Sequence, residues 1–196
     1  MKLIIASNNK HKIVEIKEIL GDTFGEILSQ GEAGFLGEAD ETGVTFSENS
    51  YIKAKEIADV FPDCAVLADD SGLEVDYLGG APGVNSARYC GVHGNDKANN
   101  DKLLSELEGV KERSARFVCA ITLILPDGKV LTTEGKTEGD ITLSPEGEGG
   151  FGYDCIFLSR ELNKTFGVAT DKEKNSVSHR GRALRTLATL LKLQKV

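Results

Sequence analysis

Cysteine is sparse in this chain of 196 residues. There are four, Cys64, Cys90, Cys119 and Cys155, and no two of them form a CxxC pair. Spacings this wide do not indicate a zinc knuckle or a disulfide framework. We therefore expect the protein to work in a reducing cytoplasm, with Cys119 and Cys155 serving as small core residues.

Long hydrophobic runs and an excess of positive charge are also missing. The longest apolar stretches have the length of a strand, and the N-terminus lacks the charged lead and cleavage site of a signal peptide. The net charge is -8, and the acidic residues are spread along the chain. This balance argues against a general nucleic-acid-binding surface. The sequence predicts neither export nor membrane insertion, and any functional cations must act locally.

Hydrophobic residues make up 40% of the chain, enough for one sizeable core, so we expect a single domain over residues 1–196. A buried strand at residues 3–6 precedes a helix whose Ile13, Ile16 and Leu20 share one face. A second helix is predicted at 47–61, capped by Ser47 and with Tyr51, Ala54, Ala58 and Phe61 on one face. Further helices are predicted at 96–107 and near the C-terminus, and a strand hairpin is predicted at 116–141. Helices that interleave with an antiparallel strand pair indicate an α/β architecture around a mixed sheet.

Cations follow the first predicted strand, in the segment SNNKHK at Ser7–Lys12. Its histidine and two lysines fall in the first turn of a helix, where the helix dipole disfavours each positive charge by about 0.3 to 1 kcal/mol. A second group, Lys174, His179 and Arg180, lies just before or within the first turn of the last helix. Two such groups in one chain point to a large anionic ligand.

Two adjacent carboxylates, Asp69 and Asp70, end a predicted short buried strand and precede a glycine-rich turn. If the strand continued through them, they would point to opposite sides, so that usually one faces a cleft. An Asx turn and a ligand for a metal ion or water are about equally common roles for such a pair. Glu41 is a further candidate ligand, although from the local residues alone a solvated loop glutamate is the better interpretation. Sparse carboxylates suit magnesium, which keeps several waters and often binds together with substrate phosphates.

A glycine cluster, GEGGFGYD, contains a literal GxGxxG match at Gly147, Gly149 and Gly152. A strand is predicted after it, whereas dinucleotide binding needs a helix there. The cluster is instead interpreted as a turn that presents Phe151 and Tyr153, either as core residues or as a platform for a base. The P-loop pattern is absent. Anion-binding helix starts, carboxylates and an aromatic turn together fit a nucleoside triphosphate with magnesium.

These segments, together with ETGVTFSENSYIKA and SHRGRAL, resemble the inosine/xanthosine triphosphate pyrophosphatase family over nearly the whole chain. The resemblance implies a curved mixed β-sheet flanked by helices, in two lobes with the active-site cleft between them, and usually a homodimer. It implies Mg2+-dependent hydrolysis of ITP, dITP or XTP to the nucleoside monophosphate and pyrophosphate. The acidic balance and the lack of a basic stripe argue against a nucleic-acid partner, and the strand-sized apolar stretches argue against a membrane partner.

The resemblance also implies roles for individual residues. Asp70 matches the proton acceptor, which binds the metal ion together with Glu41, while Asn49 and Asp69 match supporting positions. The residues expected to bind substrate are Ser7, Asn8, Asn9, Lys10, His11, Lys12, Lys53, Ser71, Phe151, Gly152, Tyr153, Asp154, Lys174, His179 and Arg180. Within SNNKHK, Lys12 matches the phosphate-binding lysine, and the two residues before it fall on variable positions.

One departure and two alternatives accompany the resemblance. Cys155 stands where the family commonly has proline, which could loosen the exit of the loop without removing a functional group. The first alternative is the related septum-associated nucleotide pyrophosphatase type, which favours pyrimidine or modified nucleotides. The second is a non-catalytic nucleotide-binding protein, against which the presence of both Glu41 and Asp70 argues.

Overall fold

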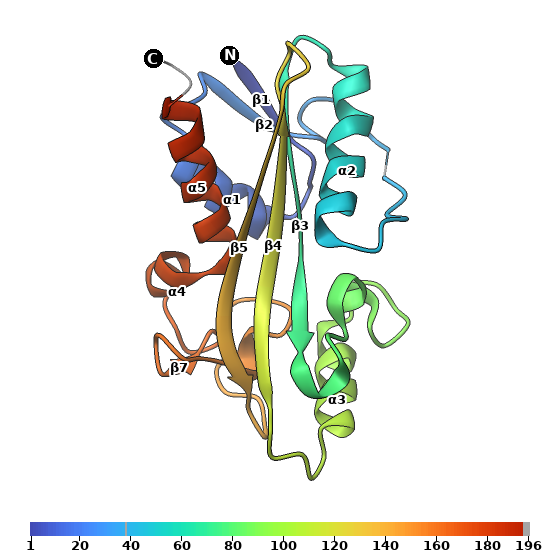
Figure 1. Cartoon of the computed structure of the whole chain (residues 1–196), viewed down its shortest axis with the longest axis vertical. Coiled ribbons are helices and arrows are strands. Elements are labelled where there is room, and N and C mark those ends of the chain that lie inside the picture. The colour runs from blue at the N-terminus through green and yellow to red at the C-terminus, as the bar shows by residue number, and fades with distance from the viewer. Residues whose placement is uncertain (38, 194–196) are drawn as a thin grey trace. The chain divides into compact units, whose positions relative to one another are not determined.

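The sheet is the central feature of the computed structural model, which describes residues 1–37 and 39–193 (Figure 1). Within these residues seven strands form one sheet in the order β2-β1-β3-β4-β5-β6-β7. Their bounds are Lys2–Ile5 (β1), Glu26–Ser29 (β2), Ala65–Val75 (β3), Ser114–Ile124 (β4), Val130–Ile141 (β5), Phe157–Ser159 (β6) and Lys164–Thr165 (β7). Strand β1 runs parallel to β2 and β3, whereas β6 runs antiparallel to β5 and β7. The predicted α/β fold with a mixed sheet is confirmed.

Helices alternate with strands β1 to β4 along the chain, and two further helices follow β7. Their bounds are Lys10–Leu20 (α1), Phe46–Val60 (α2), Asp96–Glu106 (α3), Asp171–Val177 (α4) and His179–Leu193 (α5), with short 3-10 helices at Asp76–Leu78, Gly83–Arg88 and Asp154–Ile156. The helices predicted after the first strand, at 96–107 and near the C-terminus are confirmed as α1, α3 and α5. None of the helices in the described part of the chain is long and apolar enough to cross a membrane.

The chain divides into two compact units. The first unit contains residues 1–70, 119–135 and the chain from Arg180 onward, and the second contains residues 71–118 and 136–179. Strands β3, β4 and β5 each begin in one unit and end in the other. A single domain over residues 1–196 and a cleft between two lobes both stay predictions.

The first unit packs helices on both faces of its strands. Alternate residues of β1 enter different clusters, because successive side chains of a strand point to opposite faces. Leu3 and Ile5 pack with the apolar faces of α1 and α5, while Ile4 packs with Ala54 and Ile57 of α2. In Figure 1, α1 and α5 accordingly lie on one side of β1 and α2 on the other.

The second unit has a core rich in aromatic rings. Phe117 of β4 lies 4.6 Å from Phe157 and 6.0 Å from Phe166, measured between ring centroids. Leu103 and Leu107, from α3 and its end, belong to the same buried cluster. The loops of this unit are therefore attached to a packed core of their own.

Strand β3 is longer than predicted. The prediction of a short strand that ends at the two aspartates was wrong, because β3 continues through them to Val75. Leu73 and Val75 are fully buried in the core of the second unit, which favours continuation of the strand. The chain turns later, at Gly79 and Gly80, whose φ angles of 61° and 93° suit glycine.

Helix α2 also begins differently from the prediction. Its N-cap is Thr45 rather than Ser47, because Thr45 and Glu48 form a reciprocal capping box. Tyr51 is 43% exposed, so it does not lie on the buried face as predicted. That face carries Phe46, Asn49, Ser50, Ala54 and Ile57.

Candidate functional site

The loop from β1 into α1 is shaped by its own polar side chains. The Ser7 hydroxyl oxygen accepts a hydrogen bond from the backbone N–H of Asn9 at 3.1 Å. Asn9 Oδ1 in turn accepts from the backbone N–H groups of His11 and Lys12 at 3.0 and 3.2 Å. Asn9 is therefore the N-cap of α1, and the loop has a fixed shape before any ligand binds.

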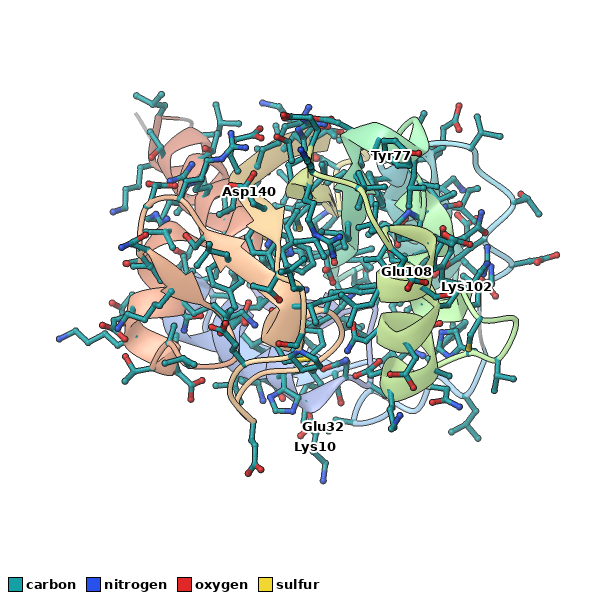
Figure 2. All side chains as sticks on the ribbon, turned by 90° about the horizontal axis from the view of Figure 1, so that it is seen from below. Lys10, Glu32, Tyr77, Lys102, Glu108 and Asp140 are labelled. Atoms are coloured by element: carbon teal, nitrogen blue, oxygen red, sulfur yellow. The ribbon has the colours of Figure 1, made fainter. Side chains whose placement is uncertain are left out.

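Four predicted substrate residues of this loop are exposed, namely Asn8, Asn9, Lys10 and His11. Asn8 Oδ1 accepts from the backbone N–H of Gly31 at 3.1 Å, which attaches the loop to the chain after β2. Lys10 and His11 are exposed, and Figure 2 shows Lys10 projecting outward from the protein. Lys12 differs from both because its side chain is 18% exposed and reaches a buried carboxylate.

That carboxylate is Asp69, on one face of β3. Its Oδ2 lies 3.0 Å from Lys12 Nζ and accepts a hydrogen bond from Arg180 Nε at 3.2 Å. Arg180 also donates from Nη1 to Glu15 Oε2 at 2.7 Å. The Asp69 and Arg180 side chains are almost completely buried, so these charges are compensated inside the first unit.

Burial and charge act in opposite directions on Asp69. Burial alone raises the pKa of its carboxyl, but the positive charges of Lys12 and Arg180 outweigh burial and hold the pKa well below its ordinary value. Burial likewise lowers the pKa of Arg180, and the Asp69 and Glu15 carboxylates raise it above the ordinary value. Asp69 is therefore a permanent anion that positions two cations.

Asp70 points to the opposite face of β3, as the two-residue period of a strand requires. Its Oδ1 accepts a hydrogen bond from Lys53 Nζ at 3.0 Å, and its Oδ2 accepts from Asn49 Nδ2 at 3.3 Å. Lys53 Nζ also donates to Glu41 Oε1 at 3.0 Å. Asn49 is fixed because its Oδ1 accepts from the Gly43 N–H at 2.8 Å. Four residues that the resemblance assigns to the site therefore form one cluster in the first unit.

The pKa of Asp70 shifts in the direction opposite to that of Asp69. Burial raises it above the ordinary value for aspartate, and Lys53 offsets that effect only in part. The pKa of Lys53 is raised, because the charges of Asp70, Asp69 and Glu41 outweigh the effect of burial. Asp70 therefore has the character of a group that can take up a proton.

The Asp70 cluster fits a magnesium ion by its donor chemistry. Lys53 Nζ, a cation, already lies 3.0 Å from both the Glu41 and the Asp70 carboxylates. In residues 1–37 and 39–193, no three or more His, Cys, Asp or Glu side chains gather as a metal site. A cation held by two carboxylates must complete its coordination with water and phosphate oxygens, which is the habit of Mg2+.

The glycine-rich loop of the second unit is organised around Asp154. Its Oδ2 accepts hydrogen bonds from the backbone N–H of Phe151 at 2.8 Å and from Lys174 Nζ at 2.6 Å. Lys174 Nζ also lies 4.7 Å from the centroid of the Phe151 ring, within the range of a cation–π interaction. A Cβ on Gly150 would approach Asp154 Oδ2 to 2.1 Å, so the loop needs glycine there.

Two other predicted substrate residues lie in the core of the second unit. Tyr153 is 4% exposed, and its hydroxyl donates to the backbone oxygen of Ser86 at 2.8 Å. His179 is 6% exposed and stacks on Phe117, with ring centroids 4.8 Å apart. Ser71 is half-buried in β3. The aromatic turn was expected to present Phe151 and Tyr153 either as core residues or as a platform for a base. Tyr153 is a core residue, whereas Phe151 is half-buried.

Sequence reasoning missed Glu15, Asp96 and Asn100. Glu15 lies three residues after Lys12 on α1, and a charged residue beside the buried Ile16 was the available signal. Asp96 and Asn100 are four residues apart on α3 and bind the backbone of Gly152. The four-residue spacing of Asp96 and Asn100 places both on one face of α3, but no local sequence pattern identified Gly152 as the residue that this face contacts.

A capped loop before α1, two adjacent buried carboxylates and lysines directed at them define a class of protein that binds a phosphate-bearing substrate at an α/β sheet. The chain belongs to the Ham1 family, whose family model matches residues 3–190. Pyrophosphatases of this family depend in general on a metal ion.

Relatives and solved structures agree with this membership. The chain is 52% identical to the dITP/XTP pyrophosphatase of Clostridium perfringens, covering 97% of each sequence. It is 47% identical to the dITP/XTP pyrophosphatase of Bacillus subtilis, covering 96% of each. Among solved structures, the Staphylococcus aureus Ham1 protein is 38% identical and superimposes with a TM-score of 0.90, over 99% of this chain and 100% of that one. The family resemblance drawn from the motifs is confirmed.

Proposed function

We propose that this chain hydrolyses the non-standard purine nucleotides dITP, ITP and XTP to the nucleoside monophosphate and pyrophosphate, with Mg2+ as cofactor. The observation that carries the proposal is the pair Asp69 and Asp70, which point to opposite faces of β3 and have opposite pKa shifts. One carboxylate stays charged and organises cations, while its neighbour can accept a proton. The names of the relatives support the choice of substrate.

In the proposed reaction Asp70 accepts a proton from the attacking water. The water oxygen bonds to phosphorus, the bond between the α- and β-phosphates breaks, and pyrophosphate leaves as the anion. In the metal-free protein, burial raises the pKa of Asp70, which favours proton uptake by this carboxylate. Asn49 and Lys53 hold its two oxygens and orient them.

Lysines and the metal ion meet the negative charge of the phosphates. Glu41 and Asp70 would hold Mg2+, which supplies charge neutralisation for phosphoryl transfer. Lys12, held by Asp69, and Lys53, held by Asp70 and Glu41, have Nζ atoms fixed before substrate arrives. Fixed cations stabilise developing charge without reorganisation at the moment of reaction.

We assign base recognition to the loop of the second unit, from Phe151 to Asp154, with Lys174. The Phe151 ring offers a stacking face, which is worth about 1 to 3 kcal/mol for a base. Selectivity requires hydrogen bonds to the 6-oxo edge, since a site built for that acceptor leaves the amino group of adenine unpaired. Arg180 is committed to Asp69 and Glu15, so we assign it to positioning Asp69.

The test is a panel of nucleotides assayed with and without Mg2+, with the products identified. We expect hydrolysis of dITP, ITP and XTP to monophosphate plus pyrophosphate, much slower hydrolysis of dATP, and no turnover after metal removal. Preference for UTP or TTP would indicate the septum-associated type instead. Binding of dITP without turnover would overturn the enzymatic proposal.

Compartment and assembly are part of the same proposal. The cysteines of the described residues are free thiols, which fits a reducing cytoplasm. We also propose that the enzyme is a homodimer, as the resemblance implies. Light scattering of the purified protein at micromolar concentration measures its mass directly.

A further inference from the structure

Helix α3 binds both the backbone N–H and the backbone carbonyl of Gly152, within the second unit. The backbone N–H of Gly152 donates to Asp96 Oδ2 at 2.7 Å, and its carbonyl oxygen accepts from Asn100 Nδ2 at 3.0 Å. Asp96 and Asn100 are four residues apart, so they lie on the same face of the helix. One rigid element therefore binds the donor and the acceptor of a single loop residue.

The Asn100 side chain is committed to donating. Its residue is 6% exposed, its Nδ2 also lies 3.4 Å from Cys155 Sγ, and its Oδ1 is buried with no hydrogen-bond partner. Rotating the amide by half a turn would place Oδ1 against the Gly152 carbonyl, with two acceptors facing each other. The contact with the loop is kept even though it leaves a buried acceptor unsatisfied, which marks it as an unusual feature of the fold.

Fixing Gly152 also fixes its neighbours. Gly152 has a φ angle of 63°, and its preceding residue, Phe151, donates its backbone N–H to Asp154 Oδ2. The Phe151 ring and the Asp154 carboxylate are therefore attached to a peptide segment whose orientation α3 determines. Lys174, bonded to Asp154 and placed over the Phe151 ring, depends on the same segment.

We propose that Asp96 and Asn100 are positioning residues that set base selectivity by holding Gly152 in place, an inference that rests on the proposed function of this loop. Neither residue needs to touch the substrate. Hydrogen-bond discrimination between bases depends on donor and acceptor positions, and a displacement of about 1 Å can cost a hundredfold in rate. Loss of either bond to Gly152 therefore reduces selectivity more than it reduces turnover.

The variants differ in whether position 96 or 100 can still form its hydrogen bond to Gly152. Asp96→Ala removes the acceptor, whereas Asp96→Asn keeps an oxygen that can accept from Gly152. Asn100→Leu has a similar shape but no donor, and it also removes the unsatisfied buried acceptor, so the fold is retained. The control is Lys97→Ala, because the Lys97 side chain lies on the same helix and is 86% exposed.

The first measurement needs no nucleotide. The chain contains no tryptophan, so Phe151→Trp gives the loop a single fluorescent reporter. In that background we expect Asp96→Ala and Asn100→Leu to raise the acrylamide quenching constant by about twofold, since a released loop is more accessible. Asp96→Asn and Lys97→Ala should match the Phe151→Trp parent. Quenching equal to the control in both variants overturns the claim that α3 holds the loop.

The second measurement is the ratio of kcat/KM for dITP to kcat/KM for dATP, in protein that retains Phe151. We expect Asp96→Ala and Asn100→Leu to lower this ratio by about tenfold, mostly through a higher KM for dITP. Asp96→Asn should keep the ratio of the parent protein, because its side-chain oxygen can still accept from Gly152. Increased quenching with an unchanged ratio overturns the role in selectivity. If the parent hydrolyses no nucleotide, the proposed function fails, and the quenching result still decides whether α3 holds the loop.

Discussion

The Asp69–Asp70 site of the first unit and the Gly152 loop of the second unit are built from different chemistry. The first gathers full charges, with Lys12, Lys53 and Arg180 paired to carboxylates at 2.7 to 3.2 Å. The second is held mainly by peptide groups, with one ion pair between Asp154 and Lys174. Charges suit polyanionic phosphates, and oriented peptide hydrogen bonds suit the neutral edge of a base.

This difference predicts that the two regions control different kinetic quantities. Changes in the first region should lower turnover or phosphate affinity for every nucleotide alike. Changes in the second should alter the ranking of nucleotides. This division of roles is wrong if a variant of the first region changes the ranking of nucleotides, or if a variant of the second region lowers turnover of every nucleotide alike.

The largest expected effect belongs to Asp70→Asn. The amide keeps the shape of Asp70 but replaces one of its two acceptor oxygens by a donor, and it cannot accept the proton of water. We therefore expect kcat for dITP to fall by about a hundredfold to ten-thousandfold. The measurement is steady-state turnover with saturating nucleotide. Asp59→Asn is a matched control, because Asp59 is exposed on α2 and pairs with Lys55. Near-parental turnover of Asp70→Asn would refute the assignment of Asp70.

The next largest effect is on stability, through Asp69→Asn. Removing this buried anion leaves Lys12 and Arg180 without their shared partner, which should lower the free energy of unfolding by about 3 kcal/mol at pH 7. Urea unfolding measures the loss. Asp59→Asn should change the free energy of unfolding by less than about 0.5 kcal/mol.

The pH dependence of this loss has a definite sign. The pKa of Asp69 is depressed in the folded protein, so its stabilisation is complete above the unfolded pKa of about 3.9 and is lost as pH falls through the folded pKa. The difference in unfolding free energy between parent and Asp69→Asn should therefore shrink below about pH 3.9. A difference that stays constant from neutral to strongly acid pH would contradict the pairing of Asp69.

Local patterns identified the elements and the two faces of the aspartate pair. The two-residue period of a strand predicted that Asp69 and Asp70 would diverge if the strand continued through them, as β3 does. The apolar spacing was sufficient to predict α1 and α5. Strand length was mispredicted, because the glycine and serine after Asp70 are typical of a turn. The buried Leu73 and Val75 outweighed that local preference.

Partners distant in sequence could not be predicted. Asp69 meets Arg180 across 111 positions, and the Tyr153 hydroxyl meets Ser86 across 67. Hence neither the commitment of Arg180 to internal carboxylates nor the burial of Tyr153 was visible in the motifs. The contacts of α3 with Gly152 were missed for the same reason, since they join residues 52 and 56 positions apart.

A smaller effect distinguishes the two lysines of the first loop. Lys12→Ala should raise the KM for dITP by about tenfold to a hundredfold, because it removes the cation held by Asp69 that we propose binds the phosphates. Lys10→Ala should change KM by less than about threefold, since Lys10 is exposed and projects outward (Figure 2). Both variants should leave the dITP to dATP ratio unchanged. A larger KM effect at Lys10 would overturn the match of Lys12 to the phosphate-binding position.

The smallest expected effect is that of Cys155→Ala, which tests how the second region is held. The Cys155 thiol is a weak acceptor for Asn100 Nδ2 at 3.4 Å, whereas the Gly152 carbonyl is a strong one at 3.0 Å. Removing the thiol should therefore change the dITP to dATP ratio by less than about twofold. A change as large as that of Asn100→Leu would mean that Asn100 acts through Cys155. In that case the departure from the usual proline, rather than the binding of Gly152, would set the selectivity of this chain.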